Sequence, residues 1–133
     1  MSPWQQELIT QISGHLYKQI GPFYSSHDVP TLHVLSREGD EVTFLFEHYV
    51  YNYAQSGSDW ADHYFVRGTA EVAGERLVTS AFTLVRTIHL TESESNDYSP
   101  STVAALMVAG KVDEVDEAIA HGRTWSDEPE PAY

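Results

Sequence analysis

Apolar residues recur at helical spacing at the start of the chain. Ser2-Pro3 offers a capping residue followed by a proline suited to the first helical turn, with Gln5 placed for a capping box, and Gly21-Pro22 supplies a stop. The residues at intervals of four are Trp4, Leu8, Ile12, Leu16 and Ile20. This stripe predicts an amphipathic N-terminal helix that buries one face.

The middle of the chain alternates between apolar and polar positions, and turn-forming residues separate the alternating runs. The runs predict strands over 31–37, 41–53, 63–73 and 77–91. The segments between the first two and the last two strands are short enough for hairpin turns. We therefore expect a four-stranded antiparallel meander, interrupted by a polar loop over 54–62.

Helical signals return after the last strand. Residues 91–99 form a polar connector, a helix over 100–109 is capped by Ser99, and a helix over 111–121 ends at Gly122. The expected class is α+β: an N-terminal helix, a four-stranded antiparallel meander, two short C-terminal helices and an extended acidic tail.

The chain is expected to divide into one folded unit and a tail. Residues 1–123 form a single α+β domain, whereas residues 124–133 carry acids between two prolines and contribute nothing to a core.

Alternation along each strand assigns side chains to the two faces of the sheet. The main core, facing the first helix, should contain Phe44, Phe46, Val66, Phe82 and Leu84. Polar residues gather at one end of the same face, where pairing through the turns should place Asn52, Tyr64 and Arg86 roughly in one row, with His48 further along near Gly68. They predict a pocket for an anion or a carbonyl group. In the alternative interpretation, Arg86 extends past the sheet edge or pairs with an acid such as Asp28.

The second face is too rich in tyrosine for a face that fully meets water. It carries Tyr49, Tyr51, Tyr53 and Phe65. Either the C-terminal helices cover it in a second core, or another protein chain does, since tyrosine combines apolar area with a hydrogen bond. The acids of the last helix are the remaining candidates for an interaction face, or else an ordinary solvated stripe: Asp113, Glu114, Asp116 and Glu117.

Charge is the strongest compositional signal. Twenty acidic residues face seven basic ones, for a net charge of −13. This field repels phosphate backbones and attracts basic surfaces, so we expect a protein partner and no direct nucleic-acid binding. Adaptation to a salty cytoplasm or to genome composition is the alternative explanation. No apolar run of about 20 residues and no secretory signal are present, which predicts a cytoplasmic protein without membrane contact.

The sequence offers little catalytic chemistry. The chain has no cysteine, which excludes disulfides and thiolate sites. Seven histidines occur without metal-ligand spacing, and neither a GxSxG elbow nor a glycine-rich phosphate loop is present. We predict no catalytic residue, no metal and no cofactor. Asp59, Asp62 and His63 beside Trp60 are the one acid–base group next to a large aromatic residue.

Three functions fit these observations. The first is a small acidic non-enzymatic domain that engages a basic partner surface, similar in size and charge to immunity proteins and to phage-encoded inhibitors. The second is a structural subunit of a larger assembly, such as a virion or tail component, that packs against copies of itself. The third is a cone-shaped α+β binder or enzyme with a pocket around Arg86.

Overall fold

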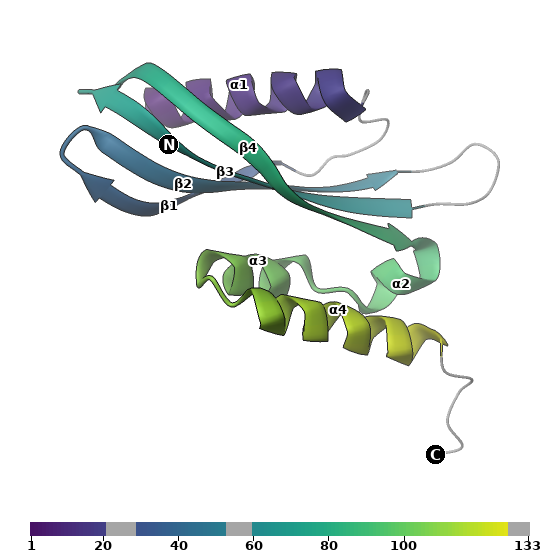
Figure 1. Ribbon diagram of the computed structural model, residues 1–133. Helices are drawn as coiled ribbons and strands as arrows, with labels where there is room; N and C mark the ends of the chain where they lie inside the picture. Colours follow the sequence, from purple (N-terminus) through teal and green to yellow (C-terminus); the bar gives the residue numbers. More distant parts are fainter. Residues whose placement is uncertain (21–28, 53–59, 128–133) are drawn as a thin grey trace.

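The protein folds as a sheet between two helical layers (Figure 1). The computed structural model describes residues 1–20, 29–52 and 60–127, without the side chains at 17, 19, 20, 52 and 120–127. The elements are α1 (Pro3–Ile20), β1 (Thr31–Glu38), β2 (Glu41–Asn52), β3 (Trp60–Ala73), β4 (Arg76–Thr91), α2 (Glu92–Asp97), α3 (Pro100–Val108) and α4 (Val112–Asp127). The predicted α+β class is confirmed.

The strands form one four-stranded antiparallel sheet in chain order, β1-β2-β3-β4. Two-residue turns join β1 to β2 and β3 to β4. Each turn begins with a glycine in the left-handed region, Gly39 at φ 60° and Gly74 at φ 64°, which a residue with a Cβ adopts only with strain. The third strand begins at Trp60 rather than at His63, so part of the predicted loop belongs to the sheet.

Helix α1 packs on one face of the sheet and builds the first core. Its predicted stripe is buried through Leu16, whereas the side chain of Ile20 lies outside the described residues. Across from α1, this core contains Phe44, Phe46 and Val66 together with partly buried sheet residues. The latter include Phe82 and Leu84. The predicted main core is therefore confirmed, and each fully buried large apolar side chain contributes about 1.5–3 kcal/mol.

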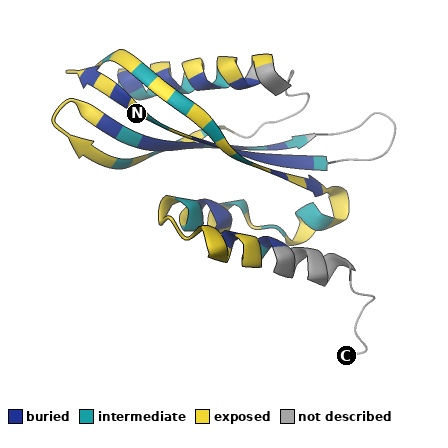
Figure 2. Cartoon of the chain, viewed as in Figure 1, coloured by how far each residue is buried: buried dark blue, intermediate teal, exposed yellow. Residues whose placement is uncertain are grey.

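The opposite face of the sheet is covered by the C-terminal helices, which form a second core (Figure 2). Its fully buried centre is Phe65, and Val103 of α3 and Val115 of α4 pack in the same cluster. The sheet contributes Leu45, Ala61, Ile88 and Leu90. The chain itself thus covers the tyrosine-rich face, as one of the two alternatives predicted.

Bulges in the two edge strands correct one assignment of faces. Phe65 pairs with Arg86 but Val66 pairs with Leu84, so Val85 is an extra residue in β4. A one-residue insertion moves every later side chain to the other face. The assignment of Arg86 to the α1 face is therefore wrong: Arg86 lies on the same side as Ile88 and Leu90, which belong to the second core.

The C-terminal helices differ from the prediction in number and length. Residues predicted as a connector form the short helix α2, whose capping box joins the Thr91 hydroxyl to the Glu94 amide and the Glu94 carboxylate to the Thr91 amide. Helix α4 does not end at Gly122 but continues to Asp127, because an interior glycine costs a helix only about 1 kcal/mol. Residues 128–133 of the predicted tail lie outside the described residues.

Two glycines of the described elements should respond to the same substitution with opposite signs. A Cβ at Gly68 in β3 would lie 2.1 Å from the carbonyl oxygen of Ala81 and 2.8 Å from the Cα of Phe82. Both obstacles are backbone, so Gly68→Ala should lower the free energy of unfolding by about 3 kcal/mol. A Cβ at Gly14 in α1 meets nothing within 4 Å, so Gly14→Ala should raise it by about 0.5–1 kcal/mol.

Urea denaturation of the two variants beside the wild type measures both effects. A Gly68→Ala protein as stable as the wild type would mean that β3 and β4 do not approach as closely as described.

Candidate functional site

The predicted pocket does not assemble as expected, because the β2–β3 register differs by four residues from the predicted one. Tyr64 lies opposite His48, whereas Asn52 lies opposite Trp60. A shift by an even number preserves the faces but exchanges the neighbours across the sheet. His48 and Tyr64 are thus brought together on the α1 face, Arg86 lies on the opposite face, and the side chain of Asn52 is outside the described residues.

An acid and a further histidine join His48 and Tyr64 at this end of the α1 face. The Asp62 Oδ1 lies 2.6 Å from the Nδ1 of His89. Burial, followed by the charge of Asp62 and a hydrogen bond to it, raises the pKa of Tyr64, so the phenol keeps its proton and donates to the carboxylate. Asp62 is thus held by Tyr64 and His89 at the polar edge of the first core.

Arg86 has a structural partner on the opposite face. Its guanidinium donates to the Asp116 carboxylate, which joins β4 to α4. Arg86 thus pairs with an acid, as the alternative interpretation predicted, and this acid is Asp116. The suggested partner Asp28 lies outside the described residues.

The predicted interaction face separates into buried and exposed members. Phe65 is fully buried in the second core, Tyr49 and Tyr51 are half-buried, and Tyr53 is outside the described residues. The acids of α4 are exposed, and two of them pair with bases: Asp116 with Arg86, and Glu114 with Lys111 at 3.7 Å. Asp113 and Glu117 are also exposed. Of these residues, the α4 acids are therefore the most exposed to solvent.

A buried chain of hydrogen bonds crosses the second core, and sequence reasoning missed it. The Nε2 of His63 lies 2.9 Å from the Oε1 of Glu47, and its Nδ1 lies 2.6 Å from the hydroxyl of Tyr98. The other carboxylate oxygen of Glu47 lies 2.6 Å from the Nε2 of His33. His63 is fully buried, and the Glu47 side chain is 12% exposed.

The pKa shifts determine the direction of the protons in this chain. Burial alone would raise the pKa of Glu47, but hydrogen bonds and charge interactions with His63 and His33 outweigh it and lower the pKa below 4.5. Burial also raises the pKa of Tyr98, which therefore remains a phenol. With neutral imidazoles, Tyr98 donates to the Nδ1 of His63, and His63 and His33 each donate from Nε2 to Glu47.

Two hollows open beside this carboxylate, between β1, β2 and the start of α3. One, of about 400 Å³, is lined by Val29, Glu47, Tyr49, Tyr51 and Pro100. The other, of about 550 Å³, is lined by Thr31, His33, Glu47, Ser101, Ala104, Ala105 and Val108. Glu47 lines both hollows, so its charge faces space that a small molecule can enter.

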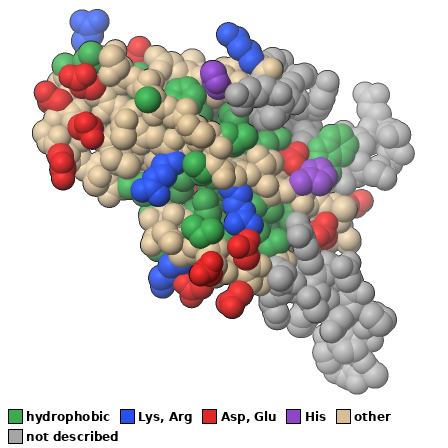
Figure 3. Space-filling view, viewed as in Figure 1, with side chains coloured by type: hydrophobic (Ala, Val, Ile, Leu, Met, Phe, Trp, Pro, Cys, Tyr) green, Lys and Arg blue, Asp and Glu red, His purple; other side chains and the backbone are tan. Residues whose placement is uncertain are grey.

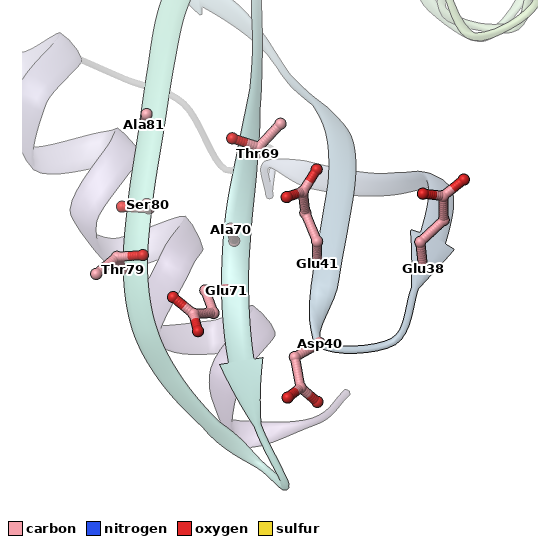
Figure 4. Close-up of a pocket in the computed structure, with 9 residues that line it drawn as sticks. All are labelled: Glu38, Asp40, Glu41, Thr69, Ala70, Glu71, Thr79, Ser80 and Ala81. Atoms are coloured by element: carbon pink, nitrogen blue, oxygen red, sulfur yellow. The ribbon is translucent and has the colours of Figure 1, made fainter.

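A third hollow lies at the turn end of the sheet, where the C-terminal helices do not reach (Figure 4). It measures about 520 Å³, and four carboxylates line it together with small side chains. The acids are Glu38, Asp40, Glu41 and Glu71. Figure 3 shows acidic side chains gathered at this end of the sheet and again along the C-terminal helices.

The acid–base group suggested beside Trp60 is divided by the sheet. Asp62 points to the α1 face, where it meets His89, whereas His63 points to the second core and meets Glu47. Asp59 lies outside the described residues. Adjacent strand residues face opposite ways, so Asp62 and His63 cannot act on one substrate atom.

Comparison with protein families, with curated proteins and with solved structures finds no match for this chain. Within the part of the chain that the structure describes, no group of three or more histidine, aspartate or glutamate residues is arranged to hold a metal ion. Among the same residues, no helix has the length and apolar character needed to span a membrane.

The hydrogen bond from Tyr98 can be tested by removing a single oxygen. Tyr98→Phe keeps the ring in the second core but leaves the Nδ1 of the fully buried His63 without the donor that it now has. An unsatisfied buried acceptor costs about 1–3 kcal/mol, so the free energy of unfolding should fall by this amount. Chemical denaturation measures it, and an unchanged midpoint would show that His63 does not depend on Tyr98.

The depressed pKa of Glu47 predicts the direction of a pH effect. Stability from a carboxylate whose pKa is lower in the folded state is present above its unfolded pKa, near 4.5, and is lost as the pH falls through the folded value. Glu47→Gln should therefore flatten the loss of stability below about pH 4.5.

Unfolding free energies of the variant and the wild type, measured at several pH values, give the two slopes. Glu7→Gln, which removes an exposed acid of α1 outside both carboxylate clusters, is the control. Parallel acid limbs for Glu47→Gln and the wild type would contradict the assignment.

Proposed function

We propose that the protein is a small acidic domain of the cytoplasm that binds a partner protein through a basic surface on that partner, as inhibitors and immunity proteins do. The observation that carries this proposal is the carboxylate-lined hollow at the turn end of the sheet. Lysine or arginine side chains of a partner would enter it and pair with its acids.

The register supports this role because it places like charges directly opposite one another. Glu41 pairs with Glu38 in β1 and with Glu71 in β3, so three carboxylates lie in one row across three strands. Like charges at paired positions destabilise a sheet by about 0.2–1 kcal/mol. A bound cationic surface would relieve this repulsion, and the gain would add to the affinity of the complex.

The lining of the hollow suits a basic guest. Besides the acids it contains Thr69, Ala70, Thr79, Ser80 and Ala81, all small. No lysine or arginine is among the described residues that line it. Two acids of α4, by contrast, already have basic partners within the chain: Asp116 pairs with Arg86, and Glu114 pairs with Lys111. The α4 acids therefore suit long-range steering of a basic partner, and the hollow suits its contact.

The hypothesis that the protein is a structural subunit of a larger assembly has less support from the structure than from the sequence alone. It relied on a tyrosine-rich face that another chain would cover, and α3 and α4 cover that face within the chain. The hypothesis of a pocket around Arg86 relied on a register that the protein does not have.

An oligo-arginine peptide is a suitable probe for the hollow, and two variants of equal charge separate local contact from net charge. One variant neutralises the hollow with E38Q, D40N, E41Q and E71Q, and the other neutralises exposed helix acids with E92Q, D113N, E114Q and E117Q. The hollow variant should lose about tenfold more affinity than the helix variant, because contact charges count more than distant ones.

Fluorescence anisotropy at rising ionic strength measures these affinities. Binding by the wild type should weaken steeply as salt shortens the Debye length from about 30 Å at 0.01 M to about 3 Å at 1 M. Equal losses in the two variants would mean that the peptide senses net charge alone, and affinity flat with salt would reject the proposal.

A further inference from the structure

We propose that the hollow of about 400 Å³ beside Glu47 binds a substituted ammonium ion. Such an ion is a protonated organic amine, whose charge would lie against the carboxylate and whose apolar body would lie against Tyr49 and Tyr51. This site is separate from the carboxylate-lined hollow in position and in ligand. The hollow beside Glu47 lies under the start of α3, whereas the other lies at the turn end of the sheet.

The charge of the site favours a cation. Hydrogen bonds from His63 and His33 keep Glu47 ionised. The described residues that line the two hollows beside Glu47 include no lysine or arginine. A carboxylate that faces a hollow without lysine or arginine in its described lining can accept a charge-assisted hydrogen bond from an ammonium group.

The aromatic side chains favour an organic cation over a metal ion. Glu47, Tyr49 and Tyr51 occupy alternate positions of β2 and project from the same face. The faces of tyrosine rings attract ammonium groups, and carbon-bearing ammonium ions use this attraction best because they hold little water. Val29 and Pro100 are the other described residues that line the hollow, and both have apolar side chains.

The carboxylate is held in place before any ligand arrives. Its two oxygens have partners in different strands, His63 in β3 and His33 in β1, and His63 is itself held by Tyr98. A preorganised acceptor loses little freedom on binding, which raises affinity. The hollow of about 400 Å³ is within the size range of small-molecule sites.

The amino end of α3 has an electrostatic effect that opposes cation binding, so the test includes an anionic probe. Pro100 lines the hollow and is the first residue of this helix, and the amino end of a helix carries partial positive charge that favours anions. The full charge of Glu47 outweighs this half charge, so an anion should bind more weakly than a cation of the same shape.

Three probes of similar shape separate charge from apolar contact. We expect 2-phenylethylammonium to bind the full chain and to shift the NMR signals of residues around Tyr49 and Tyr51. Neutral 2-phenylethanol and anionic phenylacetate should bind at least about tenfold more weakly. Equal binding of the alcohol would reduce the site to an apolar hollow, and tighter binding of phenylacetate would assign it to an anion; either result overturns the proposal.

Variants locate the probe at Glu47. Glu47→Gln should weaken 2-phenylethylammonium binding at least about tenfold, whereas Glu7→Gln, of the same net charge and exposed on α1, should change it less than about twofold. Since Glu47→Gln also alters the buried chain, Tyr51→Leu provides a second test at the half-buried wall and should weaken binding about fivefold. Unchanged affinity in both Glu47→Gln and Tyr51→Leu would refute the site.

One further probe distinguishes the sources of the amine. Nα-acetyl-lysine amide represents a lysine of a partner protein, and 2-phenylethylammonium represents a free amine. Tighter binding of either supports the shared chemistry and shows which source fits. The variant with E38Q, D40N, E41Q and E71Q should bind both amines as the wild type does, so failure here is distinguishable from failure of the proposed partner binding.

Discussion

The structure depends on the pairing of β2 with β3, because this ladder has a core on both sides. Phe44, Phe46 and Val66 project toward α1, whereas Leu45 and Phe65 project toward the C-terminal helices. The pairing is unbroken over its whole length, and alternation allows no side chain to change faces within it. A shift of one residue would exchange the two cores, so both helical layers enforce a single register.

Irregularity is confined to the edge strands, and this explains which parts of the fold the sequence could predict. The α1 stripe, the meander and the first core follow from local periodicity and were confirmed. The bulges at Leu35, Val78 and Val85 lie in β1 and β4, where they interrupt edges that could otherwise pair with another chain. A bulge leaves no periodic signal in the sequence, so the prediction put Arg86 in the correct strand but on the wrong face of the sheet.

The buried chain could not be predicted because it depends on the register. Glu47 and His63 are diagonal neighbours only if Asn52 pairs with Trp60. The prediction started β3 at His63 rather than at Trp60, which shifted the pairing of β2 with β3 by four residues. This shift preserved the two faces and hence the core, but it gave the polar residues the wrong cross-strand neighbours. The Thr91–Glu94 capping box of α2, by contrast, can be recognised in the sequence. The helix that it begins ends at its C-cap Tyr98, whose hydroxyl is hydrogen-bonded to His63.

Carboxylates of the same sheet have two different electrostatic environments, and the difference depends on whether a helix covers them. Under α3, Glu47 is ionised because His63 and His33 donate to it, so the protein has already met the cost of burying its charge. At the uncovered turn end, Glu38, Glu41 and Glu71 have like charges as cross-strand neighbours, so their repulsion remains in the folded state. Folding alone would favour neutral residues there. Positive charge from a partner would relieve this repulsion, which is why we propose a large basic surface for this row and a single small cation for the hollow beside Glu47.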